Sequence, residues 1–105
     1  MHQHYQELTK NKANYISLSP LSFLARTADI FGERTAIVYE DRHYSWQQTY
    51  ERSRALASAL THHGFGLGDT VSIIAANTPE MYEAHFGVPM AGCVLNTINT
   101  RLEAE

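Results

Sequence analysis

Hydrophobic and polar positions follow two different periods along this chain, and the changes of period separate expected helices from expected strands. The first helical stretch opens with Ser19 and Pro20, an N-cap residue followed by a proline at the first helical position. Apolar residues then recur every three or four positions as far as Gly32, a typical helix stop. This spacing predicts one amphipathic helix. Its apolar face consists of Leu21, Leu24, Ala25, Ala28 and Phe31.

The segment 35–46 is rich in β-branched and aromatic residues on either side of a polar turn at Glu40 and Asp41. This pattern predicts a short β-hairpin. Ser45 and Gln48 then have the Ser-x-x-Gln spacing of a capping box, so a second helix is expected to begin there. Its apolar face, which ends before Gly64, consists of Tyr50, Ser53, Leu56, Ala57 and Leu60.

A mostly apolar run, residues 70–75, is short enough for a strand buried on both faces. It follows a helix, which favours parallel pairing with another strand. Thr78 and Pro79 repeat the N-cap and proline pattern and predict a third helix. Pro89 lies inside that helical pattern, and we expect it to kink or end the helix near residues 87–88.

The last expected strand covers residues 93–97, and residues 99–105 start a further helix with no apolar segment after it. The order helix, hairpin, helix, strand, helix, strand predicts an α/β fold. We expect an N-terminal hairpin plus a doubly wound, largely parallel sheet with flanking helices. Residues 1–18 are expected to form a polar N-terminal arm. Residues 19–105 then form part of a domain, interrupted before it is complete.

Composition narrows the classes of function. A chain of 105 residues forms one domain or less. Its net charge of −3 is spread without a basic stripe, which argues against nucleic acid or an anionic membrane as a partner. The single cysteine, Cys93, cannot form an internal disulfide, and no signal peptide or apolar run of roughly 20 residues is found. These features predict a cytoplasmic protein without a transmembrane segment.

The glycine cluster at residues 64–68 resembles a phosphate-binding loop only superficially. Such loops follow a strand and open a helix, whereas this cluster follows a helix and leads into a strand. We therefore expect a plain turn, which Asp69 caps or positions. The acidic pairs are expected to be solvated, with Glu40 and Asp41 in the hairpin turn and Glu80 and Glu83 in the first turn of a helix.

The six histidines do not have the spacing of a metal site. His2 and His4, and likewise His62 and His63, have no further ligands at zinc-binding spacing. His62 and His63 suit the negative end of a helix dipole. His85 is expected to be a hydrogen-bonded packing residue more readily than a general base.

Nucleophilic catalysis finds no support among the serines or the cysteine. Cys93 lies at a strand start between small and apolar neighbours and is expected to be a buried structural thiol. Ser45 belongs to a helix cap, and no Gly-x-Ser-x-Gly elbow is present.

Residues 14–105 resemble the N-terminal part of the adenylate-forming, AMP-binding acyl-CoA synthetases. Trp46 and Gln48 depart from the commonest residues of the first matching string. The last string, residues 96–102, is typical of the branch that acts on fatty acids and related carboxylates. Three strings in the family's order carry the resemblance, namely His43–Tyr50, Gly68–Glu80 and Pro89–Asn99.

The resemblance implies a ligase that joins a carboxylate to AMP from Mg·ATP and then transfers the acyl group to coenzyme A. In the family, the phosphate-binding loop with its lysine, the ribose-binding acid and a second catalytic lysine all follow the matched region. The only lysines here, Lys10 and Lys12, lie in the N-terminal arm. No catalytic, cofactor-binding or metal-binding residue is therefore assigned, and no cofactor is expected on this chain itself.

Three interpretations remain open on the sequence alone. The first is an N-terminal fragment of a medium- or long-chain acyl-CoA ligase, inactive on its own, whose partner is the remainder of the synthetase. The second is a freestanding α/β module that associates with itself or a partner through unpaired sheet edges. The third, weaker, interpretation is a small nucleotide-binding α/β domain.

Overall fold

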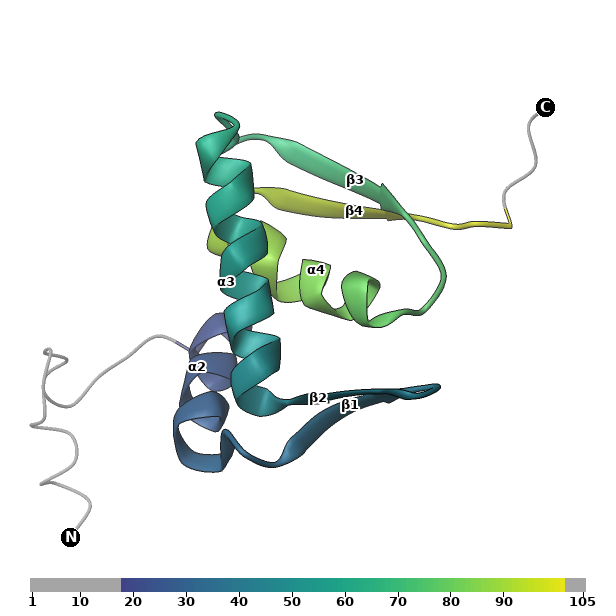
Figure 1. Ribbon diagram of the computed structural model, residues 1–105. Coiled ribbons are helices and arrows are strands. Elements are labelled where there is room, and N and C mark those ends of the chain that lie inside the picture. The colour runs from purple at the N-terminus through teal and green to yellow at the C-terminus, as the bar shows by residue number, and fades with distance from the viewer. Residues whose placement is uncertain (1–17, 102–105) are drawn as a thin grey trace, which may run out of the picture.

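The computed structural model describes residues 18–101, in which helices and strands alternate along the chain (Figure 1). The expected N-terminal arm, residues 1–18, lies outside the described residues except for Leu18. The expected final helix, residues 99–105, lies outside them beyond Arg101, and residues 100–101 form a turn. The elements are α2 Pro20–Phe31, β1 Thr35–Tyr39, β2 Arg42–Ser45, α3 Trp46–His62, β3 Thr70–Ile74, α4 Pro79–Met90 and β4 Val94–Ile98.

The helix starts confirm the capping residues expected from the sequence. The Ser19 hydroxyl accepts a hydrogen bond from the backbone N–H of Leu21 at 3.2 Å. At the start of α3 the capping box is complete, because Gln48 N donates to Ser45 Oγ at 3.1 Å and Ser45 N donates to Gln48 Oε1 at 2.8 Å. Thr78 caps α4, with Pro79 at its first position. Local sequence therefore decides where each helix begins.

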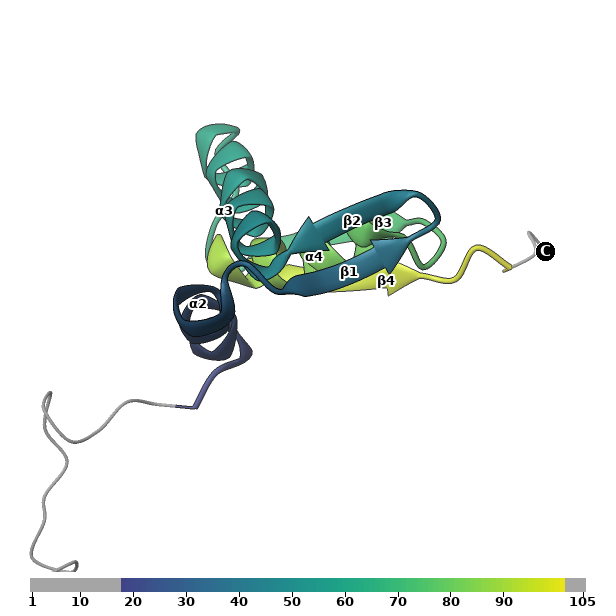
Figure 2. The same ribbon diagram turned by 60° about the horizontal axis from the view of Figure 1, so that its bottom comes forward.

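The predicted hairpin is present, with β1 and β2 paired antiparallel. Its turn places Glu40 at a φ of 54°, in the left-handed region, and both Glu40 and Asp41 are exposed as expected. The hairpin and the β3–β4 sheet lie on opposite sides of α4, which forms the middle layer (Figures 1 and 2). The molecule is thus a mixed α/β arrangement, as predicted.

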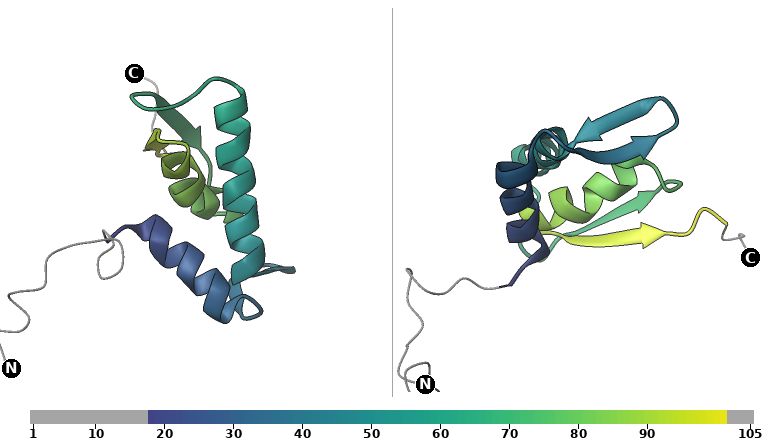
Figure 3. Two further views of the ribbon diagram at one scale, coloured as in Figure 1. Left: turned by 90° about the vertical axis from the view of Figure 1, so that its left-hand side faces the viewer. Right: turned by 90° about the horizontal axis from the view of Figure 1, so that it is seen from below.

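The parallel pair is also confirmed, with β3 and β4 aligned in register from Thr70 opposite Val94 to Ile74 opposite Ile98. One face of this pair packs on α4. The other face is open, and Figure 3 shows no described element lying over it. The prediction that residues 70–75 are buried on both faces is therefore wrong for the described chain, because α4 covers one side alone. Buried Ala84, Val88 and Cys93 form the core, together with the partly buried residues Leu56, Leu60, Val71, Ile73, Ala91 and Leu95.

The prediction that Pro89 ends α4 near residues 87–88 is wrong, because the helix continues to Met90. The alternative, a kink at this point, stays a prediction. Pro89 lies in the last turn, where the missing N–H removes one intrahelical hydrogen bond. The turn is held on both sides of it. Val88 is only 1% exposed in the core, and Ala91 N donates to the carbonyls of Gly87 and Val88.

Candidate functional site

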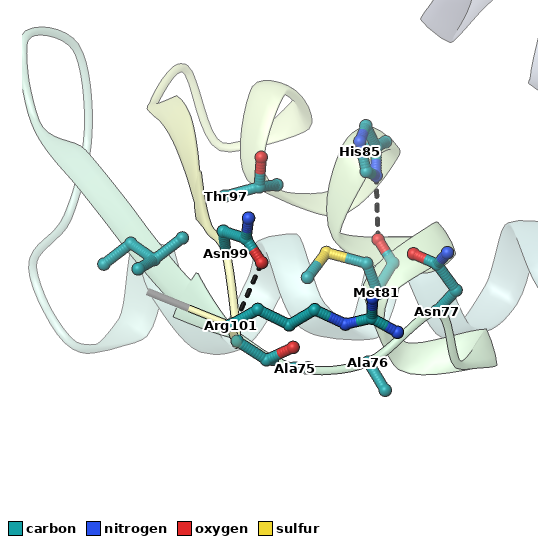
Figure 4. Close-up of a pocket in the computed structure, with 10 residues that line it drawn as sticks. Ala75, Ala76, Asn77, Met81, His85, Thr97, Asn99 and Arg101 are labelled. Carbon is teal, nitrogen blue, oxygen red and sulfur yellow. Dashed lines mark hydrogen bonds between the residues drawn. The ribbon is translucent and has the colours of Figure 1, made fainter. Parts of the chain in front are cut away.

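The carboxyl ends of β3 and β4 border a pocket of about 530 Å³ against α4 (Figure 4). Ligands of open parallel sheets bind at this edge, because the loops that follow the strands and the helix starts meet there. The turn from β3 into α4 supplies one wall, and the end of β4 supplies the other. The polar side chains that line the pocket are Asn77, His85, Thr97, Asn99, Thr100 and Arg101.

His85 is fixed in one tautomer by its own helix. Its Nδ1 donates to the carbonyl oxygen of Met81 at 2.8 Å, because a carbonyl can only accept (Figure 4). When the ring is neutral, Nε2 is then the hydrogen-bond acceptor. This confirms the expected hydrogen-bonded histidine, although the residue is exposed rather than packed in the core.

The opposite wall is shaped by the turn after β4. Arg101 N donates to Asn99 Oδ1 at 2.9 Å, which fixes the path of this segment. The Arg101 side chain extends from this turn toward Met81 and Asn77 on the first wall (Figure 4). The pocket thus combines one guanidinium with amide and hydroxyl groups, a set that suits a polar or anionic ligand.

The glycine cluster at residues 64–68 is a turn, as predicted. Gly64 and Gly68 have φ values of 89° and 88°, which favour glycine. Asp69 Oδ2 accepts a hydrogen bond from Gly66 N at 2.8 Å, so Asp69 positions the turn as expected. Cys93 is buried beside it, with Sγ 3.5 Å from the Gly66 carbonyl oxygen.

The histidine pairs do not meet other potential ligands in the described chain. His62 ends α3 and His63 is its C-cap residue, as the dipole argument predicted. His2 and His4 lie outside the described residues. Between residues 18 and 101, no three His, Cys, Asp or Glu side chains converge in a way that could hold a metal ion.

One prediction about the acidic residues is wrong, because Glu83 is buried with its side chain 8% exposed. Its carboxylate accepts hydrogen bonds from the Arg52 guanidinium, through Nε and, at 3.3 Å, through Nη2. The hydrogen bonding with Glu83 raises the pKa of Arg52 above its usual value. Arg52 in turn lies over the Tyr44 ring at 4.4 Å from its centroid. The sequence signal was faint, since the partner lies 31 residues away on another helix.

Glu80 is solvated as predicted, but it is also paired. Arg42 Nη2 donates to Glu80 Oε1 at 2.6 Å and to the Tyr44 hydroxyl at 2.7 Å. The hydrogen bond from Arg42 lowers the pKa of Glu80. We define Arg42, Tyr44, Arg52, Glu80 and Glu83 as the ionic cluster. It joins the hairpin, α3 and α4, and so holds in place the helix that carries His85.

The lowered pKa of Glu80 gives a pH prediction. A carboxyl group with a depressed folded-state pKa stabilises the fold above its ordinary pKa and loses that contribution as pH falls through the lowered value. We expect the contribution of Glu80 to be present above about pH 4.5 and to decline below it. An NMR titration of the Glu80 side-chain carboxyl measures the pKa directly. A midpoint at or above 4.5 would contradict the pairing, and Arg42→Gln should raise the midpoint.

Comparison with known proteins places the chain in a family. Residues 24–105 match the profile described as AMP-binding enzyme. The chain belongs to this family. An acetate–CoA ligase of Humulus lupulus is 55% identical over 98 residues, which cover 93% of this chain and 17% of that protein. A trans-cinnamate:CoA ligase, named as peroxisomal, of Petunia hybrida is 50% identical over 92% of this chain and 17% of its own length.

Solved structures of AMP-binding enzymes show the same fold. A protein of Rhodopseudomonas palustris that is named as a long-chain-fatty-acid CoA ligase superposes with a TM-score of 0.77 at 30% identity. The match covers 82% of this chain and 22% of that chain. O-succinylbenzoate coenzyme A synthetase of Bacillus subtilis, with ATP and magnesium, gives 0.71 at 28% identity, over 77% and 22%. The present chain thus spans about a fifth of these proteins, and it forms a partial subdomain of the synthetase fold.

AMP-binding enzymes use ATP, magnesium and coenzyme A. A site for magnesium and ATP needs carboxylates for the metal ion and cationic side chains for the phosphates. We call the pocket at the carboxyl ends of β3 and β4 the carboxyl-edge pocket. Its lining includes Arg101 but no carboxylate that could hold magnesium. Residues 18–101 also contain no lysine to meet the phosphates. These residues therefore do not form a magnesium–ATP site by themselves.

No helix among the described residues is long and apolar enough to cross a bilayer.

Proposed function

We propose that this chain is the N-terminal part of an ATP-dependent acid–thiol ligase. The reaction would convert a carboxylate, ATP and coenzyme A into acyl-CoA, AMP and pyrophosphate through an acyl-adenylate. The observation that carries the proposal is the family match over residues 24–105, at 55% identity to an acetate–CoA ligase. In this role the chain supplies the hairpin, the parallel pair and one edge of a ligand site. The remainder of the synthetase is its partner.

The chain alone is expected to be inactive. Its described residues hold neither a carboxylate set for magnesium nor a lysine for the phosphates, and phosphoryl chemistry depends on such charge stabilisation. ATP–pyrophosphate exchange with acetate, benzoate, trans-cinnamate and decanoate checks this, with the acetate–CoA ligase of Humulus lupulus as the positive control. We expect exchange at the level of the protein-free blank. Carboxylate-dependent exchange by the purified chain would overturn the expectation.

The substrate class is best placed among smaller carboxylates. Relatives at 44–55% identity are named for acetate, butyrate, trans-cinnamate, benzoate and 2-methylpropanoate. Their names favour short or aromatic acids over the medium- or long-chain fatty acid expected from the sequence.

A cytoplasmic location stays a prediction, and the peroxisomal names of several relatives make the peroxisome its alternative.

A second function, association without catalysis, is favoured by the open β3–β4 sheet. Ile74 and Val94 are 66% and 60% exposed, so the described chain presents apolar surface to solvent. Sedimentation velocity from 5 to 500 μM separates the two functions. A self-associating module would sediment faster at higher concentration. An N-terminal fragment of a ligase would remain monomeric.

A further inference from the structure

A second pocket, of about 610 Å³, lies between β1 of the hairpin and α4, and we call it the hairpin groove. Ile37, Val38 and Tyr39 line one side of the groove, and Tyr82 and Phe86 of α4 line the other. The Tyr82 and Phe86 rings meet edge to face, with their centroids 5.3 Å apart. A mostly apolar cleft of this size, with few polar groups, has the character of a site for a small molecule.

The hairpin groove and the carboxyl-edge pocket share a wall. Asn77, Met81 and His85 line both of them. Met81 and His85 lie one turn apart on α4, and Asn77 lies just before the start of this helix. From the far side of the carboxyl-edge pocket, the Arg101 side chain extends toward Met81 and Asn77 (Figure 4). The two pockets are therefore adjacent, and one ligand can extend from the polar pocket into the apolar groove.

The polar end of this double pocket carries one fixed positive charge, the guanidinium of Arg101. No Asp or Glu side chain lines either pocket, and within residues 18–101 no carboxylate forms an ion pair with Arg101. A guanidinium matches a carboxylate in shape, because it can donate two parallel hydrogen bonds to the two oxygens. One guanidinium also balances the single charge of a carboxylate, whereas a phosphate monoester with nearly two negative charges would be left in excess.

The apolar end of the double pocket suits a hydrocarbon tail better than the open face of the β3–β4 sheet does. Ile74 and Val94 on the sheet are also exposed, but a sheet face contacts a tail from one side only. In the hairpin groove, β1 and α4 contact the tail from two sides. More apolar area is then removed from water for each methylene group, and affinity rises with that area.

We propose that an amphipathic carboxylate binds across the two pockets, with its carboxylate group on Arg101 and its hydrocarbon tail in the hairpin groove. Burial of the tail favours a fatty carboxylate over acetate and butyrate, the acids for which two relatives are named. The inference concerns binding alone. It does not depend on the proposed ligase reaction, because the argument uses only the lining and the charge of the two pockets.

The test is an NMR titration of the 105-residue chain with octanoate, with butanoate and 1-octanol as matched probes. Butanoate keeps the carboxylate group and has a shorter tail, whereas 1-octanol keeps the tail and has no charge. A fully buried methylene group strengthens binding roughly fourfold, so octanoate should bind at least about tenfold more tightly than butanoate, even with the tail partly buried. Octanoate should bind at least about fivefold more tightly than 1-octanol, because only octanoate pairs with Arg101.

Two variants test the two ends of the site separately. Arg101→Gln should weaken octanoate binding at least about fivefold and leave 1-octanol binding unchanged, because it removes the charge alone. Tyr82→Asp places a charge in the hairpin groove and should weaken the binding of both ligands at least about tenfold. The matched controls are Arg26→Gln and Ile30→Asp, at exposed positions of α2 that line neither pocket. Each control should change the affinity for octanoate by less than about twofold.

Intermolecular NOEs locate the ligand on the unsubstituted chain. The methyl group of octanoate should give NOEs to the ring protons of Tyr82 and Phe86. NOEs to Ile74 or Val94 instead would place the tail on the open sheet and overturn the proposal. Equal affinities for octanoate and butanoate, or unchanged octanoate binding by Arg101→Gln, would overturn it as well. So would the absence of a saturable shift up to about 10 mM octanoate, since binding weaker than this is too slight for a formed site.

Discussion

Replacing Arg52 by methionine is expected to lower the free energy of unfolding by about 3–4 kcal/mol, because it leaves a buried carboxylate without its partner. The Glu83 side chain is 8% exposed, whereas that of Arg52 is 37% exposed. The two ends of the ion pair therefore differ in their access to water. Methionine keeps the aliphatic packing of the arginine stem, so the loss reports mainly on the charge.

Removing the charge of the other partner, Glu83, should lower the free energy of unfolding by less. In Glu83→Gln, Arg52 keeps its contact with the Tyr44 ring and lies 3.9 Å from Glu80, so its charge remains solvated and near a carboxylate. We expect a loss of about 1–2 kcal/mol. The double variant Arg52→Met, Glu83→Leu should recover part of the Arg52→Met loss, because no unpaired charge is left.

Urea denaturation followed by circular dichroism at pH 7 measures these differences. Arg54→Met is the matched control, since Arg54 is exposed on the same helix and contacts the Tyr50 ring, and its effect should stay within about 0.5 kcal/mol. Equal losses for Arg52→Met and Glu83→Gln would contradict the asymmetry.

The ionic cluster also shows what sequence patterns can and cannot predict. Helix starts at Ser19, Ser45 and Thr78 were predictable because a cap depends on residues within three positions. Glu83 was not, because its burial depends on Arg52 and Tyr44, which approach it only after α3 and the hairpin have packed. Glu83 lies just beyond the first turn of α4, and these tertiary contacts bury a carboxylate that would otherwise be solvated.

The same division applies to α4 and to the site. Pro89 was expected to stop the helix on local grounds, but the buried Val88 beside it holds the last turn in the core. The carboxyl-edge pocket was not predicted from spacing. Its walls come from the turn after β3 and the turn after β4, and they meet only because the strands pair in parallel. The order of elements was the available signal, since parallel strands place their carboxyl ends together.

The close contact between α3 and α4 leads to the second large effect, at Gly87. A Cβ atom built on Gly87 would lie 2.9 Å from the Ser53 carbonyl oxygen and 2.7 Å from Leu56 Cδ2. The Leu56 Cδ2 atom can move, but the Leu56 Cβ atom, also 2.9 Å away, and the Ser53 oxygen are both fixed to the backbone of α3. Any side chain at position 87 must therefore push the two helices apart.

Two opposing terms set the size of the effect. Alanine favours a helix interior over glycine by about 1 kcal/mol, and overpacking a close contact costs about 1–3 kcal/mol. For Gly87→Ala the terms partly offset, and we expect a net loss of about 1 kcal/mol. For Gly87→Val the helical gain is smaller and the collision larger, so the expected loss is about 3 kcal/mol.

Thermal and urea unfolding of Gly87→Ala and Gly87→Val measure both values, with Gly66→Ala as the control. A Cβ at Gly66 meets no atom within 4 Å, so that substitution should change stability by less than about 0.5 kcal/mol. The added variant Leu56→Ala, Gly87→Val separates the two obstacles. Because the Ser53 oxygen and the Cβ atom of residue 56 both remain, shortening Leu56 to alanine should not restore stability. Full recovery in that double variant would show instead that a movable side chain, and not the helix backbone, sets the spacing of α3 and α4.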